Sequence, residues 1–546
     1  MNRKLKIVLS IMLCFSIVFS LSAVAFAAYE DEKLPIILIP GFGQSETRAY
    51  DEDGNCLGIT SDFALESLTS KEIIKSLTSP AKLRSIAKKN PDMGQYVYDL
   101  LCDLFKAFRR NDDGTPVYRT EVIRFDKPYS QLSDEEQAII DKHVTLDMLS
   151  DYDDVRYYFT YDTFGSVEEF AASLHDYVVN VVLPQTGAKK VNIIPISQGG
   201  ALFVEYLDLY KEDYKYFNKI VSMVPAFDGS VIVGDILTDQ VKIYDTDYFY
   251  STALPGVFKD LTGKASTGYA IAAALQCVFK DETMVDILKR AVEAAIDCLA
   301  RNNSMLWALC PNAFYEEASE RLLSDEAHAS FKSETDRYFE ARMNFRSNIK
   351  ELQDMGVIFH TIASYGGGLF LSSLFDHGNE NADDLLHISS PGIGATSARM
   401  GETLGKDYVS PGTYCTDPAS HNHISPDNTV DASTGALAEN TWYFKNISHM
   451  MLNTREDVKS FAAELIVNDS IVDVYTYPGQ KQFVELPEYT KKLSADGKTA
   501  YYYDENGKLM YYEAVTADNS TNDFFAKIFY GFYAKLYSFI MSRILH

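Results

Sequence analysis

Short apolar runs recur along the chain and predict the strands of a buried sheet. The first, LPIILIPGFGQS over 34–45, is continuously apolar until it breaks at Pro40, Gly41 and Gly43. A run without polar alternation is typical of a parallel strand that is buried on both faces. Comparable runs follow at 155–162, 191–197, 219–225, 356–364 and 442–447. We expect these segments to form the central sheet.

Between the second and third runs, the hydrophobic pattern changes its period. Phe170, Leu174, Val178 and Val182 recur every four residues within 166–184, which predicts a helix that buries one face. Strands that alternate with helices favour a parallel sheet. We therefore predict an α/β fold with a mostly parallel central sheet flanked by helices.

Two long segments interrupt the strand series and predict insertions. Residues 46–150 are polar and charged with helical stretches, whereas 229–350 look almost wholly helical. One apolar stripe in the second insertion consists of Met284, Ile287, Leu288, Val292, Ala295 and Leu299. A helical segment over the carboxyl ends of a parallel sheet is where a substrate-covering lid would sit. Ordinary core packing explains the stripe equally well.

The chain begins with a pattern typical of a secretory signal peptide. Residues 1–27 open with three basic side chains, continue through an apolar run and close on Ala25-Phe26-Ala27. We expect removal of this segment and an exported protein, secreted or associated with the cell surface. We further expect one decorated domain over 28–467 and a separate extension over 468–546.

The C-terminal extension carries two patterns. Tyrosines alternate around Asn506-Gly507 within 498–515, which predicts a β-hairpin with a tight turn. The last stretch, 524–546, puts lysines and small residues on one narrow helical face and aromatic residues around the rest. Such a helix could lie on a membrane surface, grip another protein, or dock on the protein's own core.

Charge and cysteine usage narrow the class of protein. Of 546 residues, 77 are acidic and 50 are Lys or Arg, and loss of 1–27 changes the formal net charge from −27 to −30. A chain with this negative charge repels the phosphate backbone, so we do not expect nucleic acid as a partner. Six of the seven cysteines remain after processing. An even number in an exported protein permits disulfides, but their pairing cannot be derived from the sequence.

Ser197 is the strongest candidate for catalysis. It lies in PISQGG, after a predicted buried strand and directly before a predicted helix, ALFVEYLDLY. A strand-to-helix turn exposes a serine side chain at the N-terminus of the helix, where the helix dipole favours developing negative charge. Gly199 and Gly200 suit the close approach of strand and helix. These features predict a nucleophile for acyl transfer.

This motif and its surroundings resemble the α/β-hydrolase superfamily, in particular its bacterial lipases and esterases. The superfamily's G-x-S-x-G turn has Pro195 at the first glycine here. The resemblance implies an α/β-hydrolase fold and an oxyanion hole formed by the backbone N–H groups of Phe42 and Gln198. It covers roughly 30–45, 155–225 and 356–467, and the two insertions match no family that we can name.

The resemblance also implies a general base and an acid in the order Ser, Asp, His. His449 follows the last predicted core strand, and we expect it to be the base. Asp427 matches the acid because 425–444 resembles the stretch that precedes the histidine in lipases. Asp431 is the next alternative and Asp228 the third. The other histidines of polar, loop-like sequence are expected to be exposed: His377, His387, His421 and His423.

These residues predict a secreted serine ester hydrolase that acts on an ester or lipid through a covalent acyl-enzyme. Two alternatives remain open at this point. The same three residues could transfer the acyl group to an acceptor other than water, or the chain could be a binding protein of the cell surface without turnover. No cofactor or metal is expected, and the oligomeric state is not predicted.

Overall fold

The computed structural model describes residues 33–59, 75, 77–144, 147–450, 455–477, 479–486, 490–493, 499–503 and 509–514. The predicted signal peptide, the predicted turn at Asn506-Gly507 and the aromatic stretch 524–546 lie outside these residues.

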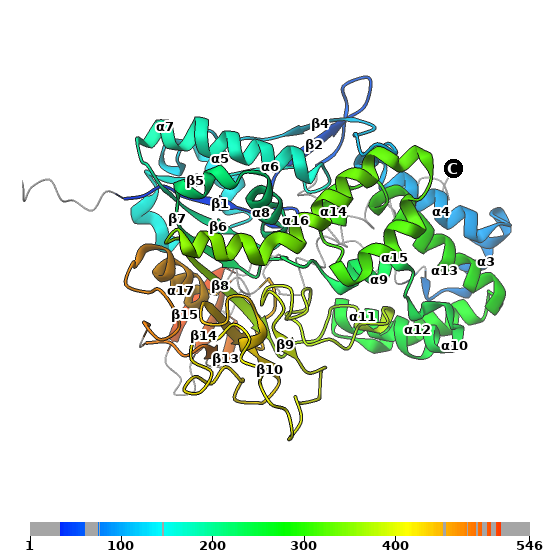
Figure 1. The fold of residues 1–546 in the computed structure, drawn as a ribbon. Coiled ribbons are helices and arrows are strands. Elements are labelled where there is room, and N and C mark those ends of the chain that lie inside the picture. The colour runs from blue at the N-terminus through cyan, green and yellow to red at the C-terminus, as the bar shows by residue number, and fades with distance from the viewer. Residues whose placement is uncertain are drawn as a thin grey trace, which may run out of the picture.

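A seven-stranded sheet forms the centre of the structure (Figure 1). Its strand order is β12-β11-β8-β7-β6-β1-β5, and every neighbouring pair is parallel. The strands are β1 (Ile36–Ile39), β5 (Arg156–Tyr158), β6 (Val191–Pro195), β7 (Phe217–Met223), β8 (Ile358–Tyr365), β11 (Thr441–Lys445) and β12 (Phe483–Val484). The first six overlap the predicted runs, so the α/β class is confirmed. The short edge strand β12 was not predicted.

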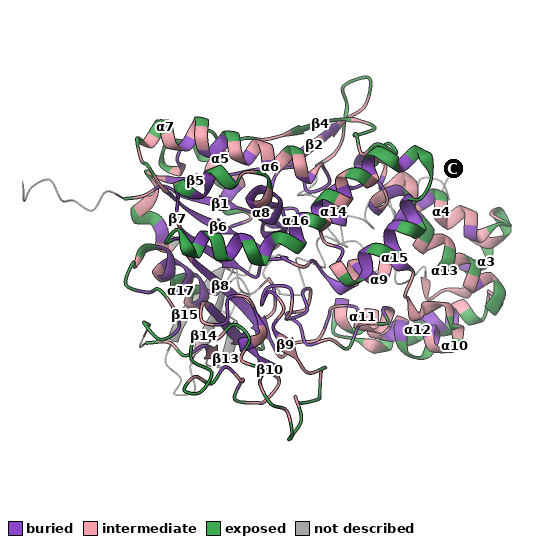
Figure 2. Ribbon diagram, viewed as in Figure 1, coloured by how far each residue is buried: buried purple, intermediate pink, exposed green. Residues whose placement is uncertain are grey.

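Successive residues of the strands serve two separate cores, one on each face of the sheet. In β1, Ile37 and Ile39 belong to one core, whereas Ile36 and Leu38 belong to the other. The first core includes residues of α6 (Val167–Asp176), α8 (Gln198–Leu209) and α16 (Ala329–Asp354), and the second includes residues of α17 (Glu456–Val467). Figure 2 shows the central strands as buried and the outward sides of these helices as exposed.

The predicted helix at 166–184 is confirmed, with an irregularity. α6 continues through a π-helical stretch, Tyr177–Val182, into α7 (Leu183–Thr186). Leu174, Val178 and Val182 are fully buried. The four-residue spacing therefore identified the buried side of the helix.

The first insertion contains a small sheet that the sequence pattern did not reveal. It consists of β2 (Thr47–Tyr50), β3 (Cys56–Ile59) and β4 (Arg119–Val122), antiparallel in the order β3-β2-β4. Residues of β4 alternate between exposed and half-buried, so no apolar run marks it. The helices of this insertion are α3 (Pro80–Lys89), α4 (Met93–Leu104) and α5 (Asp134–Asp141).

The second insertion is helical, as its sequence indicates. Its helices are α9 (Val231–Thr238), α10 (Thr246–Tyr248), α11 (Leu254–Thr262), α12 (Ala265–Gln276), α13 (Asp281–Ala295), α14 (Ser304–Trp307) and α15 (Asn312–Leu323). They lie to one side of the sheet with α3 and α4 (Figure 1). The following helix, α16, packs on α8 and belongs to the layer that covers the sheet, although the predicted insertion extended to 350.

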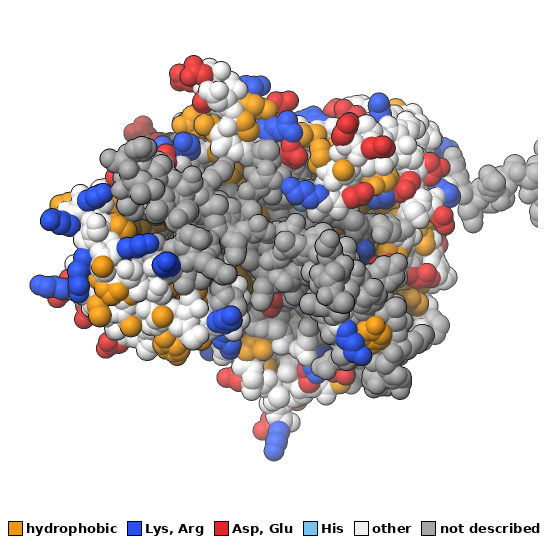
Figure 3. Space-filling model, turned by 180° about the vertical axis from the view of Figure 1, so that it is seen from behind, with side chains coloured by type: hydrophobic (Ala, Val, Ile, Leu, Met, Phe, Trp, Pro, Cys, Tyr) orange, Lys and Arg blue, Asp and Glu red, His pale blue; other side chains and the backbone are white. Residues whose placement is uncertain are grey.

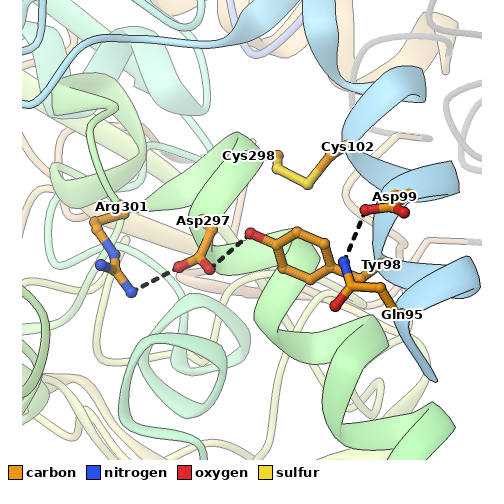
Figure 4. The surroundings of a disulfide bond; sticks show 7 residues. All are labelled: Gln95, Tyr98, Asp99, Cys102, Asp297, Cys298 and Arg301. Atoms are coloured by element: carbon orange, nitrogen blue, oxygen red, sulfur yellow. Dashed lines mark hydrogen bonds and ion pairs between the residues drawn. A yellow bond between two sulfur atoms is a disulfide. The ribbon is translucent and has the colours of Figure 1, made fainter. Parts of the chain in front are cut away.

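A disulfide joins the two insertions. Cys102 of α4 is bonded to Cys298, with 5.3 Å between the two Cα atoms and a sequence separation of 196. Nearby, the Tyr98 hydroxyl donates to an Asp297 carboxylate oxygen over 3.0 Å, and Arg301 forms an ion pair with the same residue (Figure 4). Segments far apart in sequence therefore form one covalently linked unit.

The connection from β8 to β11, residues 366–440, has little regular structure. Its strands, β9 (Thr396–Ser397) and β10 (Val430–Asp431), are two residues long and pair antiparallel. We call residues 366–440 the loop excursion. It leaves the carboxyl end of β8, at the same edge of the sheet from which the helical insertion leaves β7.

After β12, three strands form a separate antiparallel sheet in the order β13-β14-β15: β13 (Thr490–Leu493), β14 (Thr499–Tyr503) and β15 (Leu509–Ala514). Over the described residues, no helix combines the length and apolar character that crossing a membrane requires. Figure 3 shows Lys and Arg interspersed with Asp and Glu on the described part of one face. The acidic excess is therefore not gathered into one patch on that part of the surface.

Candidate active site

Ser197 occupies a sharp turn between β6 and α8. Its backbone angles are φ 51° and ψ −119°, a region that non-glycine residues rarely adopt. Hydrogen bonds to both the N–H and the carbonyl of Ser197 fix the turn. Ser197 N–H donates to the Met223 carbonyl over 3.0 Å, and Ala226 N–H donates to the Ser197 carbonyl over 2.8 Å. The surrounding strands therefore hold the serine in a strained conformation at the carboxyl edge of the sheet.

Small residues are required on the helix side of this turn. A Cβ at Gly199 would lie 2.4 Å from the Ile39 carbonyl oxygen, and one at Gly200 would lie 2.5 Å from Pro225 Cβ. Pro195, where the resemblance expects glycine, is buried and ends β6 in register with Ile39. The two glycines that follow the serine are thus the positions where the close packing leaves no room for a side chain.

His449 lies in hydrogen-bonding contact with Ser197. Its Nε2 is 2.8 Å from Ser197 Oγ, and its Nδ1 is 2.8 Å from Oδ2 of Asp383. An ionised carboxylate only accepts hydrogen bonds, so Nδ1 carries the proton and Nε2 accepts from the serine hydroxyl. Both His449 and Asp383 are almost fully buried, while Ser197 is partly accessible.

The carboxylate of Asp383 is held by the backbone around it. Its Oδ1 accepts hydrogen bonds from the N–H groups of Leu385 (3.1 Å) and Leu386 (2.8 Å). Its carbonyl accepts from the His449 N–H over 2.6 Å. Oδ2 is therefore left to face the imidazole, and two separate bonds join the histidine to this residue.

The prediction that Asp427 contacts His449 is wrong. The Asp427 carboxylate instead accepts from the hydroxyls of Ser425 (2.6 Å) and Thr429 (2.8 Å) and pairs with Lys445 at 3.2 Å. Burial raises the pKa of Asp427, but the hydroxyl donors and Lys445 outweigh this and bring it below its usual value. These contacts show a turn-forming aspartate with a complete set of partners.

The two alternative acids are also engaged elsewhere. Asp431 is fully buried, accepts from the Tyr408 hydroxyl over 2.9 Å and caps the short helical turn that follows it. Asp228 lies 3.2 Å from Arg342 and accepts from the Asn312 N–H over 3.0 Å. Neither carboxylate contacts His449.

A signal for Asp383 was present in the sequence. The resemblance expects the acid after the strand now seen as β8, and Asp383-Asp384 follows that strand within the segment ENADDLLH. Asp427 was predicted instead, because the segment around it resembles the one that precedes the histidine in lipases. Hydrogen bonds from Leu385 and Leu386 position Asp383, and such bonds leave no periodic pattern.

The loop after β1 passes beside Ser197 and is fixed by hydrogen bonds. Gly41 N–H donates to Gln44 Oε1 over 2.6 Å, and Gly43 N–H donates to Thr163 Oγ1 over 3.0 Å. Among the described residues, no acceptor is found for the Phe42 N–H between them. Hydrogen bonds therefore fix the loop on both sides of Phe42, and the Phe42 N–H is left without an acceptor among the described residues.

Gln198 offers a second such donor. It is the first residue of α8, where backbone N–H groups lack partners within the helix, and its N–H has no acceptor in the described part of the chain. A Cβ at Gly41 would lie only 2.9 Å from Ser197 Cβ, so the loop passes directly against the serine. Phe42 and Gln198, the residues predicted to supply the oxyanion donors, therefore lie beside Ser197.

Asp384 adds an unusual carboxyl group beside this hydrogen-bonded chain. Burial and the neighbouring Asp383 carboxylate raise the pKa of Asp384 to about 6, although His449 and the Ser448 hydroxyl oppose the shift. Its φ of 84° places it in the left-handed region. The charge next to the histidine therefore changes in mildly acidic conditions.

Two of the histidines expected to be exposed are buried. His387 is 9% exposed and His423 is 3% exposed. Burial lowers the pKa of His387, so a neutral imidazole is favoured there. His377 retains a partly exposed side chain and pairs with Asp235 at 2.6 Å. Polarity of the local sequence was a poor guide because the loop excursion buries polar groups against one another.

Comparison with known proteins adds little to these observations. No protein-family model and no curated protein matches the chain. A chain from the crystal structure of the Tle4-Tli4 complex is similar, with 12% sequence identity and a TM-score of 0.34. The alignment covers 80% of this chain and 98% of that chain. A likeness at this level bears neither on fold nor on function, so both rest on the residues described above.

Proposed function

We propose that the protein is an exported serine ester hydrolase of the α/β-hydrolase type, with Ser197 as nucleophile, His449 as general base and Asp383 as the acid that orients the histidine. The observation that carries this proposal is the continuous chain of two 2.8 Å contacts from Ser197 through His449 to Asp383. A binding protein without turnover has no need for a buried histidine bonded on both sides. The enzyme is thus the better explanation.

The geometry supports a covalent mechanism. Ser197 Oγ attacks the ester carbonyl carbon while its proton passes to Nε2 of His449. The cation that forms on the imidazole is stabilised by the adjacent Asp383 carboxylate. The oxygen that becomes negative is held by the N–H groups of Phe42 and Gln198. The protonated histidine then gives its proton to the departing alcohol, and water releases the acyl group by the same route.

The helical insertion supports an apolar substrate. Phe42 packs with its ring centroid 5.4 Å from that of Phe164, in an apolar cluster that also includes Leu306 and Cys298 of the insertion. Gln198 Nε2 lies 3.4 Å from the Met305 carbonyl in α14. The insertion therefore covers both residues that carry the oxyanion donors. We propose that it acts as a lid and that the substrate is an ester with an apolar acyl chain.

The test is labelling of the mature protein with a fluorophosphonate, followed by intact-mass measurement. The wild type should gain one adduct, and Ser197→Ala should gain none. Ser251→Ala removes an exposed hydroxyl elsewhere and is the matched control, which should label as the wild type does. His449→Ala should label far more slowly because the serine loses its base. Equal labelling of wild type and Ser197→Ala would contradict the proposal.

A further inference from the structure

Four metal-binding side chains meet in the loop excursion, outside the hydrogen-bonded chain at Ser197. Cys415, His421, His423 and Glu439 each provide a ligand atom, and these atoms lie within 4.8 Å of one another. Cys415 Sγ is 3.6 Å from His421 Nδ1, which in turn is 3.3 Å from Glu439 Oε1. Elsewhere in the described part of the chain, no three such side chains come as close together.

We propose that this cluster is a structural zinc site. One thiolate, two imidazoles and one carboxylate make four ligands, the number that structural zinc takes in tetrahedral geometry. The thiolate and carboxylate together supply two negative charges against the two positive charges of the ion. Nitrogen and sulfur donors disfavour Ca²⁺ and Mg²⁺, which prefer oxygen. No metal was expected from the sequence, since acyl transfer by a serine needs none, and His421 and His423 were expected to be exposed.

The tautomer of His423 is preset for metal binding. Gln482 Nε2 donates to two backbone carbonyls, of Ala438 (2.6 Å) and Thr441 (3.0 Å), which identifies its other amide atom as the oxygen. That oxygen lies 2.7 Å from His423 Nδ1, so Nδ1 carries the proton. Nε2 consequently carries the lone pair, as a metal-binding nitrogen must. A buried partner on the far ring nitrogen is the usual support of a metal-binding histidine.

Tyr475 supports both imidazoles. Its ring stacks on His421 with 4.0 Å between centroids, and its hydroxyl lies 3.1 Å from His423 Nε2. The hydroxyl donates to the lone pair of Nε2 when no metal is bound, and a metal ion would replace this hydrogen bond. The two rings are therefore oriented before the ion arrives.

Glu439 is also held in place. Its Oε1 accepts from the N–H of Thr416 over 2.8 Å and from the hydroxyl of the same residue over 2.7 Å. The carboxylate is mostly buried beside Cys415 and His421. Bonds to a ligating carboxylate fix its direction and are typical of metal sites.

The site would tie the loop excursion to the sheet. Cys415, His421 and His423 come from a stretch without regular structure, whereas Glu439 stands two residues before β11. His449 follows the other end of β11, and Asp383 lies in the same excursion. An ion at this point would stabilise a segment that has few helices or strands of its own. This role does not depend on the proposed esterase activity.

The test is zinc binding by the full chain. Protein stripped with a chelator is titrated with Zn²⁺ against a chromophoric chelator, and the bound metal is counted by mass spectrometry. We expect one tight zinc per chain, and Cys415→Ser and His423→Gln should each weaken binding at least 100-fold. Cys277→Ser and His175→Gln are matched controls, an exposed free cysteine and a histidine outside the cluster, and should bind as the wild type does.

Substitution with Co²⁺ tests the ligand set itself. Wild type should show a sulfur-to-cobalt charge-transfer band, and Cys415→Ser should lose it. Zinc should also raise the thermal midpoint of the wild type but not that of His423→Gln. The proposal is overturned if the stripped wild type binds no more zinc than Cys415→Ser, or if the cobalt form lacks the thiolate band. Both measurements are independent of ester hydrolysis.

Discussion

Two regions extend beyond the carboxyl edge of the sheet, and they are stabilised in different ways. The helices from α9 to α15 pack around apolar clusters, such as the one around Leu237 and Trp307, to which the loop excursion contributes Leu369 and Ala382. A disulfide also joins this helical insertion to α4. The loop excursion forms a smaller apolar cluster with β8 and β11, and it adds buried or half-buried polar pairs such as Asp431 with the Tyr408 hydroxyl and Asp427 with Lys445.

The two regions contribute to the candidate site in different ways: one covers it, and the other positions an atom in it. Apolar packing can cover the site without placing any particular atom, and the helical insertion covers Phe42 in this way. Its contact with Gln198 is a long hydrogen bond from Gln198 Nε2 to the Met305 carbonyl. Placing a carboxylate against His449 requires defined hydrogen bonds, and the excursion provides them at Asp383. We therefore expect substitution of Asp383 to affect the reaction rate, and substitutions in the helical insertion to affect stability.

The largest expected effect comes from Asp383→Asn. The amide can no longer fix the tautomer or stabilise the imidazolium, and kcat should fall about 10⁴-fold, the loss that such a change causes in serine proteases. Asp427→Asn removes an equivalent charge from the same excursion and should change kcat less than about threefold, because it lies in a turn away from His449. Steady-state kinetics on a soluble ester would measure both. If Asp427→Asn were the more damaging variant, the assignment of the acid would be wrong.

Removal of the disulfide should have the next largest effect, on stability alone. Cys102→Ser with Cys298→Ser frees a loop of nearly two hundred residues and should cost about 3 kcal/mol in the unfolding of the helical insertion. Thermal unfolding of both proteins at equal pH would measure this difference. The control is Cys56→Ser, which alters an exposed free cysteine in the same first insertion and should leave the midpoint unchanged. A large loss of kcat at low temperature would contradict the division of roles.

A third substitution examines the polar pairs of the excursion. Asp431→Ala removes a buried acceptor from the Tyr408 hydroxyl and from the Ser433 N–H, and should cost about 2 kcal/mol. In the helical insertion, Leu237→Ala leaves a cavity at a fully buried position and should cost about 3 kcal/mol. Chemical denaturation would compare the two. Similar stability of Asp431→Ala and the wild type would show that the excursion does not depend on this pair.

The sequence was informative where a residue follows directly from local pattern. Ser197 stands between a buried apolar strand and a helix, and His449 follows the last core strand, so chain order placed both. The helical insertion was also predictable, since its apolar stripe repeats with the helical period.

Local sequence pattern did not reveal β2 to β4 or the Cys415 cluster, and it did not single out Asp383, although chain order allows an acid after β8. Asp383 is positioned by the backbone of the two leucines that follow it, and the small sheet has polar, half-exposed strands. His423 is buried by partners far along the chain, Gln482 and Tyr475, which no local pattern connects to it. Interactions of this kind depend on the folded excursion as a whole.

The smallest expected effect concerns the pH dependence of the excursion. The pKa of Asp384 is raised to about 6 in the folded protein, mainly by burial and by Asp383, from an ordinary value near 4 in the unfolded chain. Between these two values the folded state binds more protons than the unfolded state, so stability falls as the pH rises. The cost is absent below about pH 4 and complete above about pH 6.

Asp384→Asn should remove this cost. Asparagine tolerates the positive φ at this position, so the backbone can be kept. The variant should match the wild type near pH 4 and be more stable by about 1 kcal/mol at pH 7, after allowance for partial exposure of the group. Thermal midpoints measured across this pH range would show the two curves separating. Curves that stay parallel would mean that Asp384 has the same pKa in the folded and unfolded chain, and the pH dependence of the excursion would then have to arise from other groups.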